Sequence, residues 1–272
     1  MVTRARLDAE LVRRGLARSR QQAAELIEQG RVVVRGVPAG KAATVVDRDT
    51  PVTVNRGDER EWASRGAHKL IGALDAFEVD VDGLRCLDAG ASTGGFTDVL
   101  LDRGAAEVVA VDVGYGQLVW RLRADERVRV HDRTNVRALD REQIGGPVDL
   151  TVADLSFISL RTVLPALVAC TEGELLPMVK PQFEVGKARL GAGGVVRTPE
   201  LRLAALTEVA AAARDLGLVV RGAVASPLPG PSGNVEYFLR LARSGVDVGD
   251  DVLAAAVDAR GPAAGGVGEG NP

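Results

Sequence analysis

The sequence has few cysteines and no long apolar run. Only Cys86 and Cys170 occur among 272 residues, and neither stands at the spacing of metal ligands. One pair cannot form a disulfide framework, so both are expected to be buried thiols in a reducing compartment. No apolar run reaches the roughly 18 residues that a membrane-spanning helix needs. Charged side chains interrupt the first ten residues, so we expect no signal peptide either. These absences favour a cytoplasmic protein without integral membrane association.

Lysine is also scarce. Arginine supplies 30 of the 34 positive charges, and lysine occurs only at positions 41, 69, 180 and 187. A guanidinium group does not lose its proton in proteins, whereas an ammonium group can. Because this chain uses arginine where a surface charge suffices, each retained lysine points to a task that arginine cannot perform, such as proton transfer.

The overall charge of −3 predicts no polyanionic partner, but the charge is unevenly distributed. Residues 1–69 carry 14 Lys and Arg against 9 Asp and Glu, a net charge of +5, and the remaining residues carry −8. A basic N-terminal segment before an acidic body is typical of a small nucleic-acid-binding module attached to a larger domain. The length fits about two domains, and 46% apolar residues are ample for a large core.

Residues 65–240 alternate between apolar strands and helical patterns. The expected strands are 84–88, 107–112, 127–131, 148–153, 174–179, 218–225 and 234–240. The expected helices are 65–77, 94–103, 116–124, 159–170 and 199–216. This alternation predicts an α/β fold with a mostly parallel, doubly wound sheet. Because no helix separates the last two strands, we expect them to be antiparallel.

A Gly-rich turn follows the first strand of this body. A P-loop is excluded, because Phe96 stands where its lysine belongs, and Ser92 makes the dinucleotide pattern imperfect. A plain β–α turn is one alternative. The remaining pattern, Asp88-x-Gly90-x-Ser92-x-Gly94, resembles motif I of S-adenosylmethionine-dependent methyltransferases. Asp112 ends the second strand about 20 residues later, a position suited to hydrogen bonding with ribose hydroxyls.

Further charged residues lie at the carboxyl ends of the expected strands, where open α/β sheets bind ligands. Asp154 and Lys180 end the fourth and fifth strands, Glu236 is placed in the last strand, and Lys69 lies on the helix before the first. Buried charges are costly unless paired. Two structural ion pairs are one interpretation of this set. In this order, however, the four resemble the Lys-Asp-Lys-Glu tetrad of ribose 2′-O-methyltransferases of the FtsJ class.

The N-terminal segment has its own pattern. Helices are expected over 6–15 and 20–29 and strands over 32–34 and 51–54, with a turn at 36–40. This order and the sequence from Arg6 to Val54 resemble the S4 RNA-binding domain. With this segment in front of the tetrad, residues 4 to about 242 resemble the TlyA family.

The resemblance implies a domain organisation and an activity. It implies an S4-like RNA-binding domain over 1–59, a linker over 60–64 and a Rossmann-like class I methyltransferase domain over 65–243 with a seven-stranded, mostly parallel sheet and an antiparallel last strand. Residues 244–272 are expected to be a disordered tail. The implied reaction is 2′-O-methylation of cytidine in 16S or 23S ribosomal RNA, or both, with S-adenosyl-L-methionine as cofactor. Ribosomal RNA or ribosomal subunits would be the partners of a monomeric enzyme.

The resemblance also assigns site residues, without any metal. The catalytic group would comprise Lys69, Asp154, Lys180 and Glu236, with Lys180 nearest the ribose 2′-hydroxyl. The cofactor would be held by Gly90, Ala91, Ser92, Thr93, Gly94, Asp112, Asp132 and Asp154. RNA contacts are expected from Arg4, Arg6, Arg18, Arg20, Lys41, Arg65, Tyr115, Arg133, Arg137, Lys187 and Arg189.

Five further interpretations remain to be weighed against these. Gly-rich residues 186–196 are expected to form a mobile loop, Phe157 to line a pocket or the core, and His131 to be structural. The TlyA family has also been labelled haemolysin, which would make the protein membrane-active. A non-catalytic RNA-binding assembly factor that kept the fold is the other rival. Liposome leakage tests the first rival, and methyl transfer to unmodified ribosomal RNA tests the second.

Overall fold

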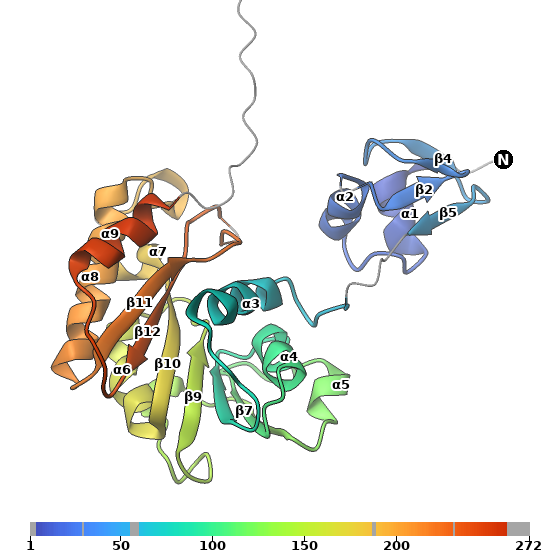
Figure 1. The fold of residues 1–272 in the computed structure, drawn as a ribbon. Helices are drawn as coiled ribbons and strands as arrows, with labels where there is room; N and C mark the ends of the chain where they lie inside the picture. Colours follow the sequence, from blue (N-terminus) through green and yellow to red (C-terminus); the bar gives the residue numbers. More distant parts are fainter. Residues whose placement is uncertain (1–3, 29, 55–59, 187–188, 231, 260–272) are drawn as a thin grey trace, which may run out of the picture. The chain divides into compact units, whose positions relative to one another are not determined.

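The computed structural model describes residues 4–28, 30–54, 60–186, 189–230 and 232–259 (Figure 1). The chain divides into two units with the boundary between Glu61 and Trp62, and each unit is considered by itself. No helix in these ranges is both long and apolar enough to span a bilayer.

The N-terminal unit combines two helices with two small sheets. Its elements are β1 (Arg4–Arg6), α1 (Leu7–Arg13), α2 (Arg20–Glu28), β2 (Val32–Val34), β3 (Val37–Pro38), β4 (Val45–Asp47) and β5 (Val52–Val54). β1 pairs antiparallel with β4, and β3, β2 and β5 form a three-stranded antiparallel sheet. Both expected helices and both expected strands are present. β1, β3 and β4 were not predicted, because none of them is a full run of β-branched residues like those in β2 and β5.

The helices of this unit enclose a small core with charged groups at its margin. Leu7, Leu11, Ala23 and Ile27 pack together from the two helices. Asp8 is also buried, and Arg6 and Arg20 both donate hydrogen bonds to it. These arginines therefore have a structural role in addition to any role toward a ligand.

The C-terminal unit is built on one seven-stranded sheet. Its first half contains α3 (Gly66–Phe77), β6 (Arg85–Ala89), α4 (Gly95–Asp102), β7 (Glu107–Val111), α5 (Trp120–Arg123), β8 (Val128–His131), η1 (Val136–Ala138) and β9 (Val148–Ala153). Its second half contains α6 (Leu160–Cys170), β10 (Thr171–Val179), α7 (Pro181–Glu184), η3 (Ala192–Gly194), α8 (Pro199–Asp215), β11 (Val219–Ala225), β12 (Tyr237–Ala242) and α9 (Asp250–Asp258).

The sheet order is β11-β12-β10-β9-β6-β7-β8, and β12 is antiparallel to both of its neighbours. The expected mostly parallel α/β sheet with an antiparallel last strand is confirmed. Helices cover both faces (Figure 1). α3, α4 and α5 pack on one face around Leu70, Leu100 and Leu122, and α6, α8 and α9 pack on the other around Leu164, Leu206 and Leu253. Cys86 and Cys170 are buried in these two cores.

Three expectations about this unit are wrong in part. The helix expected over 116–124 begins only at Trp120, because the preceding Gly114 amide donates to Asp112 and Gly116 has a φ of +65°. The last strand begins at Tyr237, so Glu236 precedes the strand. The tail expected from residue 244 contains α9, whose Leu253 is fully buried. Residues 260–272 lie outside the described ranges.

Candidate active site

The sheet topology brings three of the four predicted catalytic residues to one edge. Ala153 and Val179 end the neighbouring parallel strands β9 and β10, and Asp154 and Lys180 follow them directly. β12 runs the opposite way, and its first residue Tyr237 pairs with Val179. Glu236, immediately before β12, therefore lies at the same edge as Lys180.

Lys180 is held by two groups from the segment after β9. Its Nζ lies 2.5 Å from Asp154 Oδ1 and donates a hydrogen bond of 3.0 Å to Ser156 Oγ. Lys180 is only 7% exposed, so this ammonium group depends on these partners to offset the loss of hydration. Ser156 was missed in the sequence, because a serine two residues after a strand gives no pattern of its own.

Lys69 forms the second ion pair. It lies on α3, and its Nζ is 2.5 Å from Glu236 Oε2. Glu236 is 1% exposed, and its other oxygen, Oε1, accepts no hydrogen bond within the described ranges. A Cβ atom at Gly230 would stand 2.4 Å from that oxygen, so the lack of a side chain there leaves room for the carboxylate.

The Gly-rich turn lies directly beside the Asp154 segment. Gly90 and Gly94 have φ values of +92° and +99°, where glycine is strongly favoured. A Cβ atom at Gly90 would stand 2.6 Å from the main-chain oxygen of Asp154, and the Asp154 amide donates to Ala89 O. The turn and the Asp154–Lys180 pair are therefore one continuous site. Ala91 is buried in this turn, whereas the side chains of Ser92 and Thr93 are exposed.

Asp112 fits the cofactor position that the sequence assigns to it. Its Oδ2 accepts from Ser92 N at 2.8 Å and its Oδ1 accepts from Gly114 N at 2.7 Å. Each carboxylate oxygen retains a second lone pair that can accept from a ribose hydroxyl. The turn thus fits a nucleoside cofactor, because it offers a close backbone approach beside a fixed acceptor.

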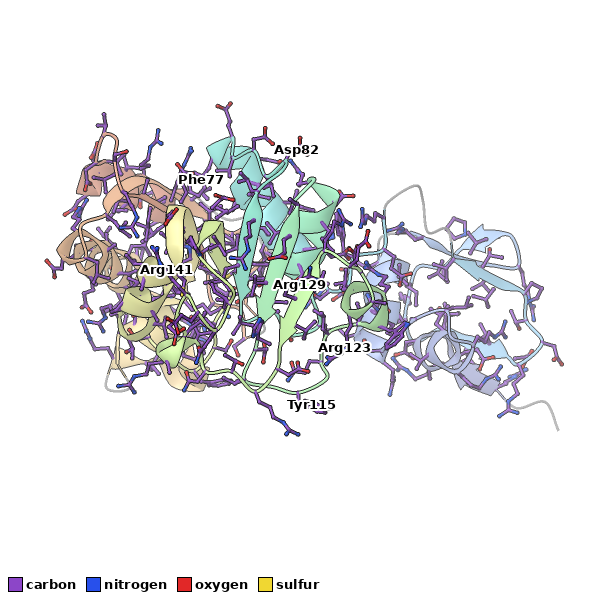
Figure 2. All side chains as sticks on the ribbon, turned by 90° about the horizontal axis from the view of Figure 1, so that it is seen from below. Phe77, Asp82, Tyr115, Arg123, Arg129 and Arg141 are labelled. Atoms are coloured by element: carbon purple, nitrogen blue, oxygen red, sulfur yellow. The ribbon has the colours of Figure 1, made fainter. Side chains whose placement is uncertain are left out.

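Three further predicted site residues follow β7 and β8. Asp132 lies 2.9 Å from Arg123 Nη1, so it already has an ionic partner. The Arg133 guanidinium carbon lies 4.3 Å from the centre of the Tyr115 ring, a cation–π arrangement. Tyr115 is 67% exposed and lies at the rim of the domain (Figure 2).

The remaining predicted RNA contacts are spread over both units. Arg4, Arg18 and Lys41 are exposed in the N-terminal unit. Arg137 is exposed after β8, Arg65 directly precedes α3, and Arg189 donates to Val185 O. Lys187 lies outside the described residues.

Phe157 does not belong to the core, so that part of its expectation is wrong. It is 92% exposed, its φ is +65°, and its ring centre lies 5.3 Å from that of Phe183. An exposed aromatic ring in a left-handed conformation needs surrounding structure to hold it. No pattern of residues around Phe157 predicts this conformation.

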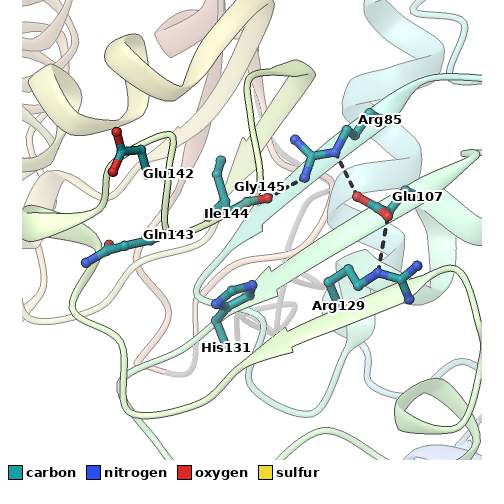
Figure 3. A pocket seen from close by; sticks show the side chains of 8 residues that line it. All are labelled: Arg85, Glu107, Arg129, His131, Glu142, Gln143, Ile144 and Gly145. Atoms are coloured by element: carbon teal, nitrogen blue, oxygen red, sulfur yellow. Dashed lines mark hydrogen bonds and ion pairs between the residues drawn. The ribbon is translucent and has the colours of Figure 1, made fainter.

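A cavity of about 500 Å³ lies elsewhere on the sheet and shares no residue with this site (Figure 3). Arg85 lines this cavity and donates hydrogen bonds to Glu107 Oε1, Gly146 O, Pro147 O and Ile144 O. Arg129 pairs with the same Glu107, and His131 lies beside them (Figure 3). Arg85 thus connects the segment before β9 to the first residues of β6 and β7, which gives this cavity a structural role.

Comparison with known proteins finds a matching family for each of the two units. Residues 62–243 match the FtsJ-like methyltransferase family, and residues 5–52 match the S4 domain. A Mycobacterium tuberculosis protein named 16S/23S rRNA (cytidine-2′-O)-methyltransferase TlyA is 66% identical over 243 residues, covering 89% of this chain and 91% of that protein. Hemolysin A of Brachyspira hyodysenteriae is 35% identical over 241 residues, covering 86% and 98%. The solved structure of a hemolysin-named protein from Streptococcus thermophilus has a TM-score of 0.74 at 36% identity, covering 95% of this chain and 96% of that one.

Proposed function

Since the chain belongs to the FtsJ-like methyltransferase family and carries an S4 domain ahead of the catalytic domain, we propose that it methylates the 2′-oxygen of cytidine in ribosomal RNA. The observation that supports the proposal most strongly is the continuity of the Gly-rich turn with the Asp154–Lys180 pair. Methyl transfer to a hydroxyl needs a bound cofactor directly beside a group that can take up a proton. The relative from Mycobacterium tuberculosis, whose printed name states this reaction on 16S and 23S RNA, supports the substrate.

The cofactor is S-adenosyl-L-methionine, which supplies an electrophilic methyl group when bound. Gly90, Ala91, Ser92, Thr93 and Gly94 would hold its methionine part, Asp112 its ribose hydroxyls and Asp132 the region of its adenine. Asp154 would contact it from the neighbouring strand. These assignments rest on the backbone cradle at Gly90 and on the remaining acceptor capacity of Asp112.

The chemical step needs the ribose hydroxyl to lose its proton while its oxygen forms the bond to the methyl carbon. Lys180 steers this oxygen through a hydrogen bond from Nζ. Lys180 would also accept the hydroxyl proton as the general base, and Asp154, whose Oδ1 lies 2.5 Å from Nζ, would orient its side chain. Glu236 would orient Lys69, with which it forms an ion pair, and Lys69 would hold Glu236 or the substrate. Alignment of the oxygen with the methyl carbon supplies the rest of the rate enhancement.

The N-terminal unit would bind folded RNA through Arg4, Arg6, Arg18, Arg20 and Lys41. Arg65, Tyr115, Arg133, Arg137, Lys187 and Arg189 would extend this contact toward the active site. The enzyme would act as a monomer in the cytoplasm, where ribosomal RNA is found. Light scattering after size-exclusion chromatography would test the monomeric state.

Lys180→Ala tests the proposed function. We expect methyl transfer from tritiated cofactor to unmodified ribosomal RNA to fall at least about 100-fold, because a positioned general base contributes that much. Calorimetry should show unchanged cofactor affinity, and Lys180→Arg should be equally inactive because it keeps the charge but cannot accept a proton. Full activity of Lys180→Ala would exclude the mechanism. Mapping of 2′-O-methylcytidine in both ribosomal RNAs, with and without the protein, would identify the target.

The name of the Brachyspira hyodysenteriae relative raises membrane lysis as a second candidate function. Release of a fluorescent dye from liposomes by the purified protein tests it. The methyl transfer assay also tests the other rival, a non-catalytic assembly factor, which would bind ribosomal RNA without modifying it.

A further inference from the structure

Helix α7 connects the catalytic lysine to the segment that holds it. α7 begins directly after Lys180 and ends at Glu184. The facing segment 154–159 lies between the end of β9 and the start of α6 and contributes both partners of Lys180, Asp154 and Ser156. A second set of contacts joins the far ends of the same two segments, and it depends on Glu184.

Glu184 is a buried carboxylate that caps a helix other than its own. It is 3% exposed, its Oε2 accepts from Ser159 Oγ at 2.5 Å, and its Oε1 accepts from Leu160 N at 2.7 Å. Leu160 is the first residue of α6, and the Ser159 side chain makes no capping hydrogen bond to that helix. Glu184 thus accepts the hydrogen bond of a backbone N–H in the first turn of α6. In most helices the side chain of the residue just before the helix accepts such a bond. Burial raises the pKa of Glu184, whereas these hydrogen bonds and Arg161 lower it.

The contacts between these ends complete the connection. The Phe183 ring of α7 lies beside the Phe157 ring of the facing segment, and Phe157 has its positive φ at this point. The two segments are therefore joined near Lys180, at the two rings and at Glu184. The mechanism proposed above uses only the first of these three junctions.

We propose that Glu184 is a positioning residue for methyl transfer, which fixes segment 154–159 against α7 and thereby sets Asp154 and Ser156 around Lys180 Nζ. This inference rests on the proposed function, in which Lys180 meets the ribose hydroxyl. A shift of about 1 Å at a reacting group can cost roughly 100-fold in rate, so a contact remote from the chemistry can control it. The main chain of Asp154 has its own hydrogen bond to Ala89 O beside the Gly-rich turn, so we expect the cofactor contacts to persist when the Glu184 contact is lost.

Glu184→Ala and Glu184→Gln in the full chain test the proposal. We expect the single-turnover rate constant at saturating cofactor and RNA to fall about 10- to 100-fold in Glu184→Ala, with unchanged cofactor affinity and KM for RNA. Glu184→Gln should recover most of the rate, because its amide oxygen can accept from Leu160 N while its NH₂ group donates to Ser159 Oγ. Glu174→Ala is the matched control. Glu174 lies on β10, the strand that leads to Lys180, and forms ion pairs with Arg240 and Arg221, so we expect lower stability with a rate within about twofold.

Each outcome decides between positioning and simple stabilisation. An unchanged rate in Glu184→Ala despite a lower Tm would overturn the proposal. A parallel loss of rate and cofactor affinity would also overturn it, as would a failure of Glu184→Gln to recover the rate.

Ser159→Ala is the second variant to measure if Glu184→Ala does not fold. It removes one of the two hydrogen bonds to Glu184 and should lower the rate about fivefold. An unchanged rate in Ser159→Ala would overturn the proposal as well. An active Lys180→Ala would instead remove the proposed mechanism, whereas an inactive Lys180→Ala beside a fully active Glu184→Ala would remove only the positioning role.

Discussion

Asp88 is a buried carboxylate just before the Gly-rich turn, and its protonation makes the stability of the fold depend on pH. It is fully buried in β6, and its Oδ2 accepts from Thr97 Oγ1 at 2.7 Å. Its Oδ1 has no hydrogen-bond partner in the part of the chain that the structure describes. Burial raises the pKa of Asp88 from 3.8 to about 7, and the nearby charges of Asp154 and Asp112 act in the same direction. Asp88 therefore holds a proton in the folded protein at a pH where an unfolded chain has lost it.

Asp88→Asn should remove a pH dependence of stability. Because the pKa is higher in the folded state, the contribution of Asp88 is fully present below pH about 4 and is lost as the pH rises toward 7. Relative to the wild type, the free energy of unfolding of Asp88→Asn should therefore increase across this range, by up to about 1.4 kcal/mol per pH unit. Urea unfolding of both proteins at pH 5, 6, 7 and 8 measures the difference. Parallel pH profiles would show that Asp88 does not titrate in this window.

The segment between β11 and β12 is tied to the Gly-rich segment before α8. Asn234, which is 2% exposed, accepts from Val196 N at 2.9 Å and donates to Gly194 O at 3.1 Å. Val196 is itself buried against Val185 and Ala205. The last residues of the segment expected to be mobile, 186–196, are thus attached two residues before the catalytic candidate Glu236.

Asn234→Ala should loosen this segment locally. We expect faster hydrogen exchange of the amides of residues 191–197, because two buried hydrogen bonds are lost, and unchanged exchange in the cofactor turn. Asn135→Ala is the matched control, since the Asn135 side chain accepts only from the nearby Arg137 N. Mass spectrometry of exchanged peptides distinguishes the two variants. Equal protection of residues 191–197 in the wild type and Asn234→Ala would show that these hydrogen bonds do not hold the segment.

The elements that sequence alone predicted are those with a strong repeating pattern. The seven strands of the sheet and their direction followed from apolar runs and from the missing helix before β12. α9 was missed because an Ala-rich helix of nine residues resembles a tail unless the surface it covers is known, and it packs against α8 and β11. Asp154 and Lys180 were recognisable from their strand-end positions, and the whole tetrad from its resemblance to the FtsJ class. Ser156 and Glu184, in contrast, act through partners that are 24 and 25 residues away in the sequence. Such contacts leave no periodic pattern in the sequence.

In the N-terminal unit, Arg6 and Arg20 have a structural task in addition to the RNA contact proposed for them. Arg6 and Arg20 both lie within 3.1 Å of Asp8 Oδ2, while their side chains remain 50% and 61% exposed. The hydrogen bond from Arg6 is the main reason that the pKa of Asp8 is lowered to about 2. Replacing both arginines with glutamate would place three carboxylates together and unfold the unit, so a loss of RNA binding in that variant would be ambiguous.

Neutral substitutions separate these two tasks. Arg6→Gln combined with Arg20→Gln should weaken ribosomal RNA binding about tenfold or more and reduce the slope of log affinity against log salt by about two, because two phosphate contacts are lost. Asp8→Asn breaks the same ion pairs but keeps both guanidinium groups, so it should lose similar stability while retaining the wild-type RNA affinity. Both variants should bind the cofactor normally, since the residues proposed to hold it lie between Gly90 and Asp154. Filter binding at several salt concentrations, with thermal unfolding of each variant, makes the comparison. If Asp8→Asn weakens RNA binding as much as the double variant does, the arginines support the unit and do not contact the RNA.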